Sequence, residues 1–386
     1  MGKRVVNQLR ILVLQSGGTT PVINSTIAGI LVEAKRLGAR VYTCKGGMEN
    51  VLAGSFQELQ TSRDNIRIFY KQPGSALTGT SRVGRLPEAV LTEIAGQIHK
   101  SGFDVLINIG GNGTLQQSKA VYKSSASKFQ VISCPKTVDN DLGDKSLEDV
   151  LFTPGFVSCI GWWNKSLSYL DIENKGAYEH EPVIVAQTFG RDTGYICAAI
   201  GHQLQRETPI AYGLPETGEG LESIVQRIKG IQKEEKRCIL VVSEGFCDKE
   251  LKNHLDKSGQ KQYGSGVTTS AQMIADELCK SGVNSRSVIP TILQRVTSEA
   301  SGYDRMTAYN QGRFSVIKAF DGKTGILVTT KKVAPLECDY IKYSEIPENY
   351  SRKLTSKFIR NHAPSDLYMS YISKLLSYEH SHSEAF

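Results

Sequence analysis

The stretch Val131-Ile132-Ser133-Cys134-Pro135-Lys136-Thr137-Val138-Asp139-Asn140-Asp141 runs from an apolar segment into a loop that carries two carboxylates. Its first four residues are typical of a short buried strand in a parallel sheet. Asp139 and Asp141 follow that strand, close to Lys136 and Thr137. This set suits phosphoryl transfer, because one aspartate can accept a proton from an attacking hydroxyl while the other helps to hold Mg²⁺. Asp-Asn-Asp is also ordinary turn chemistry, so the rest of the chain has to decide between the two interpretations.

Similar apolar runs alternate with amphipathic segments along the chain. Further strands are predicted at Leu9–Leu14, Val105–Ile109, Val183–Ala186, Cys238–Val242 and Gly325–Val328. A helix is predicted from residue 23 or 24 through Ala34. This alternation predicts an α/β protein in which crossover helices connect parallel strands. Ligands of such sheets bind beyond the carboxyl ends of the strands, where the acidic loop lies.

Composition narrows the class of protein. The chain has 386 residues, of which 22% are charged and 40% hydrophobic, so we expect a globular protein without a membrane-spanning segment. The net charge of +7 is spread along the sequence, which argues against a nucleic-acid partner. Eight scattered cysteines include no Cys-x-x-Cys pair, and Met1-Gly2-Lys3-Arg4 leads directly into strand-like sequence. We therefore expect free thiols and a cytoplasmic protein.

Glycine pairs follow two of the predicted strands, at Gly17-Gly18 and at Gly110-Gly111. Glycine lets backbone N–H groups approach phosphate oxygens, and the start of a following helix favours an anion. Glycines also close ordinary strand–helix corners, so neither pair is decisive alone. The dinucleotide fingerprint and the Walker A pattern are both absent here, which argues against a dehydrogenase and a P-loop enzyme.

The order of these motifs resembles the phosphofructokinase family, and is most similar to the branch that includes diphosphate-dependent enzymes. The resemblance covers roughly residues 10–330 and rests on eight segments: Ser16–Asn24, Gly110–Thr114, Pro135–Asp141, Thr153–Phe156, Phe189–Gly194, Pro215–Glu216, Ser243–Gly245 and Leu293–Arg295. It implies two Rossmann-like domains with the active site in the cleft between them. Residues 1–148 with roughly 294–345 would bind the phosphoryl donor, residues 149–293 the sugar phosphate, and residues 346–386 would form a helical extension.

The resemblance also implies a role for each residue of the acidic loop. Asp139 would deprotonate the 1-hydroxyl of fructose 6-phosphate, and Thr137 would contact the substrate. Asp141 would orient the site and bind Mg²⁺ together with Asp139 and Asn112. Lys136 would neutralise charge on the transferred phosphoryl group.

Binding residues are implied on both sides of the cleft. Those assigned to the donor, which would be ATP or diphosphate, are Gly17, Gly18, Arg82, Gly111, Asn112, Gly113 and Thr114. Those assigned to the sugar, besides Thr137 and Asp139, are Phe189, Gly190, Arg191, Glu244, Arg286 and Arg295. Arg286 and Arg295 would hold the 6-phosphate, since a guanidinium pairs bidentately with phosphate. One such arginine comes from a neighbouring subunit in this family, which implies a homodimer or homotetramer.

Four positions depart from the family pattern. Asn112 stands where most members have an aspartate linked to Mg²⁺, and Thr19 replaces an aspartate of ATP-dependent bacterial enzymes. Pro182 stands where a second phosphate-binding cation would come from the neighbouring subunit, and Ile292 replaces a polar residue near the acceptor. These changes leave open a kinase for another sugar, or an inactive homologue that binds a sugar phosphate or a nucleotide.

The choice of donor depends on Gly113 and Lys136. Diphosphate-dependent members usually have an aspartate at the position of Gly113, where it fills the space of the nucleotide α-phosphate. Lys136 resembles those members, but some ATP-dependent ones combine this lysine with glycine. Steric room is the harder constraint, so we expect ATP, with a reversible diphosphate-dependent enzyme as the alternative.

Overall fold

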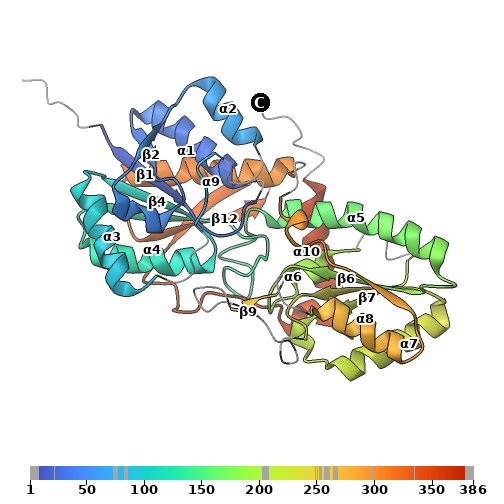
Figure 1. Ribbon diagram of the computed structural model, residues 1–386. Helices are drawn as coiled ribbons and strands as arrows, with labels where there is room; N and C mark the ends of the chain where they lie inside the picture. Colours follow the sequence, from blue (N-terminus) through green and yellow to red (C-terminus); the bar gives the residue numbers. More distant parts are fainter. Residues whose placement is uncertain are drawn as a thin grey trace, which may run out of the picture.

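The computed structural model describes residues 8–20, 22–72, 77–81, 86–201, 208–247, 249, 251, 254–255, 261–263, 268–296, 300–333 and 335–378. Within these residues the chain forms an α/β protein with two parallel-rich sheets, each covered by helices (Figure 1). The predicted fold class is confirmed. None of the helices in this part of the chain combines the length and the apolar content that a bilayer-spanning segment requires.

The first sheet has seven strands in the order β13-β12-β5-β4-β1-β2-β3. Their bounds are β1 (Arg10–Gln15), β2 (Arg40–Thr43), β3 (Gln57–Leu59), β4 (Val105–Gly110), β5 (Gln130–Pro135), β12 (Ile326–Val333) and β13 (Leu336–Lys342). The five central strands are parallel, and β3 and β13 pair antiparallel at the two edges. Helices cover both faces: α1 (Ile23–Leu37), α2 (Arg63–Lys71) and α9 (Gly302–Phe320) on one, α3 (Glu88–Lys100) and α4 (Asn112–Ser125) on the other.

The second sheet has four parallel strands in the order β11-β6-β8-β7. They are β6 (Val183–Thr188), β7 (Ile210–Gly213), β8 (Cys238–Ser243) and β11 (Ser285–Val288). One face packs against α5 (Phe156–Ala177), α6 (Tyr195–Ala199) and α10 (Asp366–Ser377), and the other against α7 (Leu221–Glu235) and α8 (Ser270–Lys280). The short elements are η1 (Met48–Ala53), η2 (Pro215–Thr217), η3 (Thr291–Gln294), η4 (Ser356–Phe358), β9 (His254–Leu255), β10 (Lys261–Gln262), β14 (Ile359–Arg360) and β15 (Ala363–Pro364).

All six predicted strands are present, each within two residues of its predicted start. The helix predicted from residue 23 or 24 is α1, which continues three residues beyond Ala34. The expected domain boundaries stay a prediction, although β12 and β13 do return to the first sheet after the second sheet is complete. All eight cysteines lie in described residues and are free thiols.

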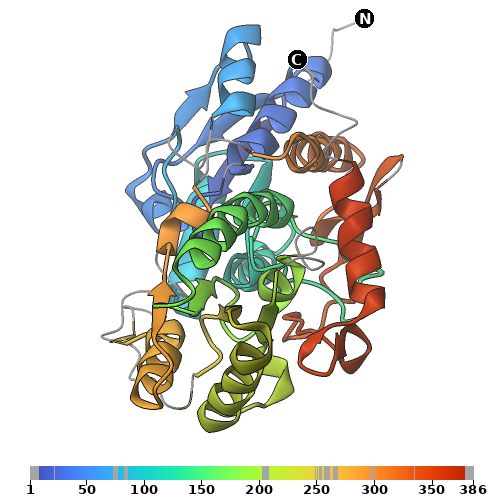
Figure 2. The ribbon, with the colours of Figure 1, turned by 90° about the vertical axis from the view of Figure 1, so that its right-hand side faces the viewer.

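The segment after β13 is more than a helical extension. It contains η4 and the small hairpin of β14 and β15 before α10. Leu354, Phe358, Tyr368 and Ile372 are buried in the same apolar cluster as α5 and α6. In Figure 2 this red segment lies along one side of the molecule. Side chains between residues 354 and 376 therefore belong to the core of the second sheet.

Two glycines allow α1 and α9 to pack with their backbones in contact. A Cβ atom on Gly29 would lie 1.9 Å from the carbonyl oxygen of Tyr309, and one on Gly312 would lie 2.1 Å from the carbonyl oxygen of Thr26. Any side chain at these positions would push the two helices apart. Gly96 on α3 is different, because a Cβ atom there meets nothing within 4 Å.

This contrast gives a matched pair of variants. Gly29→Ala is expected to lower the free energy of unfolding by about 2 kcal/mol, because overpacking forces the helices to separate. Gly96→Ala is expected to raise it by about 0.5 kcal/mol, since alanine restricts the unfolded chain and favours the helix. Urea unfolding of both variants and the wild type measures the difference. Equal effects of the two substitutions would contradict the close helix contact.

Candidate active site

Loops from three neighbouring strands meet at the carboxyl edge of the first sheet. Lys136, just after β5, donates from Nζ to the carbonyl oxygens of Ser16 (2.9 Å) and Gly18 (2.8 Å), in the loop after β1. Its backbone N–H donates to the carbonyl oxygen of Gly110 at the end of β4 (2.9 Å). Lys136 is 3% exposed, so this amine is held inside the junction rather than in solvent. The glycine loops and the acidic loop therefore meet at one edge of the sheet.

The glycines of these loops differ in how strictly the surrounding structure requires glycine. Gly17 has φ +88°, a conformation that favours glycine, and its N–H donates to the carbonyl oxygen of Ser81 (2.8 Å). Gly110 must lack a side chain, because a Cβ atom would lie 2.2 Å from Oγ1 of Thr114. Gly113, in the first turn of α4, differs from it, because a Cβ atom there would meet nothing within 4 Å. The space beside Gly113 is therefore open.

Gly111 precedes α4 as its N-cap residue, and the first turn of that helix contains no acidic side chain. The start of α4 thus presents backbone N–H groups that suit a phosphate, and the carboxylate of Asp141 lies beside this turn through its hydrogen bond with Asn112. Thr114 is buried in the same turn. Arg82, which was also assigned to the donor, lies outside the described residues.

Asp141 is fixed by two neighbouring side chains. Asn112 donates from Nδ2 to Oδ2 of Asp141 (2.9 Å), and the hydroxyl of Thr137 donates to Oδ1 (3.3 Å). The same hydroxyl accepts from the backbone N–H of Asp139 (3.2 Å). Asn112 therefore contacts Asp141 through its amide nitrogen, a contact that an ionised aspartate at this position could not make.

A second set of residues follows the strands of the second sheet. Glu244 comes after β8, and its backbone N–H donates to the carbonyl oxygen of Thr188 at the end of β6 (3.0 Å). Its Oε1 accepts from the backbone N–H of Arg191 (3.1 Å), which has φ +51°. Ser243 also donates to the carbonyl oxygen of Arg191 (3.1 Å). Gly190 is required in this turn, because a Cβ atom there would lie 2.4 Å from the carbonyl oxygen of Thr193.

Gln294 and Trp163 support this turn, and sequence reasoning assigned no role to either. Oε1 of Gln294 accepts from the backbone N–H of Phe189 (2.9 Å) and from Nε1 of Trp163 (2.8 Å). The guanidinium of Arg295 lies over the ring of Phe189, 5.2 Å from its centroid. The one signal in the sequence for this role was the polar residue Gln294 beside Arg295. The residues that it contacts, however, lie more than 100 positions away.

The two sets face each other across one site. A Cβ atom on Gly18 would lie 2.8 Å from Nη1 of Arg295, so the loop after β1 reaches the arginine of the second set. Burial and the neighbouring Asp141 raise the pKa of Asp139 to about 6, although Arg191, Arg295 and Lys136 oppose that shift. Burial and Asp139 also raise the pKa of Glu244 to about 8. The carboxylates and cations that follow the two sheets thus lie close enough to change one another's pKa.

Arg286 is placed elsewhere within the single chain. It lies on the edge strand β11, with its side chain exposed and paired with Glu181 at 2.5 Å. Its proposed contact with a 6-phosphate in a neighbouring subunit stays a prediction.

Among the described residues, no group of three or more His, Cys, Asp and Glu side chains could hold a metal ion.

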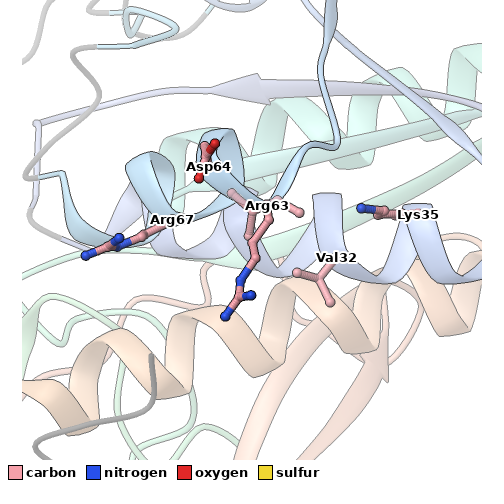
Figure 3. A pocket seen from close by; sticks show the side chains of 6 residues that line it. Val32, Lys35, Arg63, Asp64 and Arg67 are labelled. Carbon is pink, nitrogen blue, oxygen red and sulfur yellow. The ribbon is translucent and has the colours of Figure 1, made fainter.

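A separate pocket of about 690 Å³ lies between α1 and α2 (Figure 3). It is lined by Val32, Lys35, Arg63, Asp64, Ile66 and Arg67. None of these residues belongs to the two sets described above, so this pocket is distinct from the candidate active site.

Comparison with known proteins agrees with this geometry. Residues 10–318 match the family model for phosphofructokinase, so the chain belongs to the phosphofructokinase family and is a phosphotransferase of that family. It is 28% identical to an ATP-dependent 6-phosphofructokinase of Corynebacterium efficiens, over 85% of this chain and 96% of the relative. It is 26% identical to a sulfofructose kinase of Alkalicoccus urumqiensis, over 83% of both chains. A pyrophosphate-dependent phosphofructokinase from Nitrosospira multiformis has the same fold, with a TM-score of 0.81, 23% identity and coverage of 95% of this chain and 91% of that one.

The raised pKa of Asp139 predicts that its charge costs stability. Asp139→Asn is expected to raise the free energy of unfolding at pH 8 by about 3 kcal/mol, since each pKa unit corresponds to roughly 1.4 kcal/mol. The gain is complete above about pH 6 and disappears as the pH falls below 3.8, the ordinary pKa, because the carboxyl is then neutral in both states. Urea unfolding in EDTA at several pH values measures it.

Glu173→Gln, which changes an exposed carboxylate on α5, is the control and should show no such pH-dependent gain. A destabilised Asp139→Asn protein at pH 8 would contradict the assigned cost of burying this charge.

Proposed function

We propose that this protein transfers the terminal phosphoryl group of ATP to the 1-hydroxyl of fructose 6-phosphate, giving fructose 1,6-bisphosphate. The observation that carries the proposal is the position of Asp139, between a glycine-lined junction and a turn that presents Arg191 and Glu244. Membership of the phosphofructokinase family supports the same reaction.

Asp139 acts as the general base. It accepts the proton of the 1-hydroxyl as that oxygen bonds to phosphorus and the bond from phosphorus to the leaving nucleotide oxygen breaks. A base with a pKa of about 6 is ionised at neutral pH and retains enough basicity to take this proton. Lys136 lies within the same junction and offsets negative charge on the transferred group.

Mg²⁺ fits the donor set of the acidic loop. This ion is usually bound by one or two carboxylates together with phosphate oxygens of the substrate, and Asp139 and Asp141 supply such a pair. Asn112 would act beside them by fixing Asp141, with which it already forms a hydrogen bond (2.9 Å). When bound, the ion would neutralise charge on the phosphates of the donor.

The second set of residues holds the sugar phosphate. Arg191 and Glu244 offer a donor and an acceptor for sugar hydroxyls, and Arg295 offers a guanidinium for the 6-phosphate. We infer that Arg286 of a neighbouring subunit completes this phosphate site. The functional unit would therefore be a homodimer or homotetramer.

The open space at Gly113 favours ATP as the donor. A nucleotide needs room beside the phosphates, and a Cβ atom at Gly113 meets nothing within 4 Å. Similarity to an ATP-dependent relative over most of both chains supports this choice. Diphosphate is the alternative, supported by the buried Lys136 and by the fold shared with a pyrophosphate-dependent enzyme.

The acceptor has an alternative as well. Ile292 is 53% exposed on η3, three residues before Arg295, so an apolar surface adjoins the expected phosphate site. Similarity to a sulfofructose kinase supports a sugar that carries a different anionic group. Pro182 directly precedes β6, beside the edge strand that carries Arg286, so like that arginine it bears on the phosphate site of a neighbouring subunit.

A matrix of donors and acceptors tests the proposal. Initial rates with Mg²⁺ are measured for ATP and diphosphate, each with fructose 6-phosphate, sulfofructose and unphosphorylated fructose. We expect the highest kcat/KM with ATP and fructose 6-phosphate. Turnover with diphosphate alone would overturn the donor assignment, and a much higher kcat/KM for another sugar would overturn the acceptor.

Substitution at Gly113 tests the steric argument. Gly113→Asp is expected to lower kcat/KM for ATP by about 100-fold, because the carboxylate takes the space of a nucleotide phosphate and repels it. Gly113→Ala adds only a methyl group in open space and should retain most of the activity. Equal losses in the two variants would show that the space beside Gly113 is not used by the nucleotide.

The base assignment is tested with Asp139→Asn, the variant that we expect to be more stable than the wild type. Its kcat is expected to fall by about 1,000-fold, the typical contribution of a general base. Opposite effects on stability and on turnover would separate loss of the base from loss of the fold. Retained turnover would remove Asp139 from the mechanism.

A further inference from the structure

Arg352 is a fully buried arginine in the segment that follows β13. Its side chain is 0% exposed, and it lies beyond residues 10–318, the part that matches the family model. Nε donates to the carbonyl oxygen of Asn140 (2.7 Å), and Nη2 donates to Oδ1 of the same residue (2.6 Å). Nη1 donates to the carbonyl oxygens of Val150 and Asp144 (3.4 Å for the latter). The guanidinium thus holds both the backbone carbonyl and the side-chain oxygen of one residue of the acidic loop.

Asn140 stands between the two aspartates of the site. It has φ +54°, the left-handed conformation that places successive carboxylates on a sharp turn. Its side chain is fully buried, and its Oδ1 also accepts from the backbone N–H of Thr153 (3.0 Å). Its Nδ2 donates to the hydroxyl of Tyr371 on α10 (3.3 Å). Both ends of the amide are therefore held by other segments.

The backbone near Arg352 also pairs with the acidic loop. The N–H of Arg352 donates to the carbonyl oxygen of Asp141 (2.7 Å), and the N–H of Gly143 donates to the carbonyl oxygen of Tyr350 (2.9 Å). Gly143 leaves room for the guanidinium, because a Cβ atom there would lie 2.9 Å from Nη1 of Arg352. The segment after β13 is thus joined to the acidic loop by backbone hydrogen bonds as well as by the side chain of Arg352.

The chemistry of these contacts requires arginine. Within the described part of the chain, the hydrogen-bond acceptors of Arg352 are carbonyl or amide oxygens, so its charge is used to hold backbone rather than to form an ion pair. The planar guanidinium donates in several fixed directions at once, whereas the ammonium group of lysine cannot reproduce that fork. Arg352 also lies over the ring of Tyr195, 5.4 Å from its centroid.

We propose that Arg352 is a positioning residue for phosphoryl transfer: its guanidinium fixes Asn140 and thereby sets where Asp139 and Asp141 face the substrates. The kinetic consequence rests on the function proposed above, while the structural consequence does not. Positioning matters for rate, because a displacement of about 1 Å at the reacting groups can cost roughly 100-fold in turnover.

Arg352→Lys tests the proposal, since it keeps the charge and removes the fork. We expect kcat to fall by about 100-fold, with a much smaller change in KM, because the binding groups of the second sheet are not touched. Ile228→Ala is the control, because this residue is fully buried on α7, on the face of the second sheet opposite to α10. It should lose stability but keep its kcat. A full kcat in Arg352→Lys would overturn the proposal, and so would an equal loss of kcat in Ile228→Ala.

A second variant removes the other side of the contact. Asn140→Gly keeps the left-handed conformation available and keeps the backbone carbonyl that accepts from Nε, but it lacks the side-chain oxygen that accepts from Nη2. Its kcat is expected to fall as well, and the loss in the double variant with Arg352→Lys should be smaller than the product of the two single losses, because the bond from Nη2 to Oδ1 is common to both. Multiplied losses in the double variant would show that Arg352 and Asn140 act separately, against the proposal.

Amide hydrogen exchange of residues 139–144 gives a measurement that needs no substrate. We expect faster exchange in Arg352→Lys and wild-type protection in Ile228→Ala. If the wild type turns over none of the tested substrates, the proposed function fails, and hydrogen exchange alone decides the role of Arg352. Unchanged exchange in Arg352→Lys would overturn the positioning role whatever the activity.

Discussion

The buried amine of Lys136 is the contact on which the first half of the site depends. It fills the junction of three strand ends and satisfies carbonyl oxygens of the loop after β1. A lysine with 3% exposure has lost its hydration, so these carbonyls and the nearby Asp139 help to compensate its charge. The positions of Gly17 and Gly18 relative to the acidic loop follow from this one side chain.

Charges from two separate sheets are concentrated in one desolvated space. Arg191 and Arg295 lie near enough to Asp139 and Glu244 to lower the pKa of both carboxyls, yet burial still raises the pKa in each case. The folded protein therefore holds these acids in a state that costs free energy. Such a cost is expected where a carboxylate has to act as a base, and it is the usual conflict between stability and activity.

Local patterns in the sequence were enough to find the strands and the loops that end them. Apolar runs such as Val105–Gly110 and the glycines that follow them carry strong signals over a few residues. The family resemblance supplied Arg191 and Glu244, and the structure brings them together. The contacts of Gln294 with Trp163 and of Arg352 with Asn140 could not be found in this way. The first contact joins residues 131 positions apart and the second joins residues 212 positions apart. No local pattern specifies which distant group a side chain will contact.

The order of strands in the first sheet has a consequence for synthesis on the ribosome. β12 is the neighbour of β5, yet the whole second sheet lies between them in the sequence. The nascent first sheet therefore exposes an unpaired edge on β5 until the later chain emerges. The acidic loop likewise lacks the guanidinium of Arg352 until that residue has been synthesised. A chain that ended before residue 326 would carry an open sheet edge and an unsupported loop. One that ended between residues 342 and 352 would have both edge strands but would still lack the guanidinium that holds Asn140.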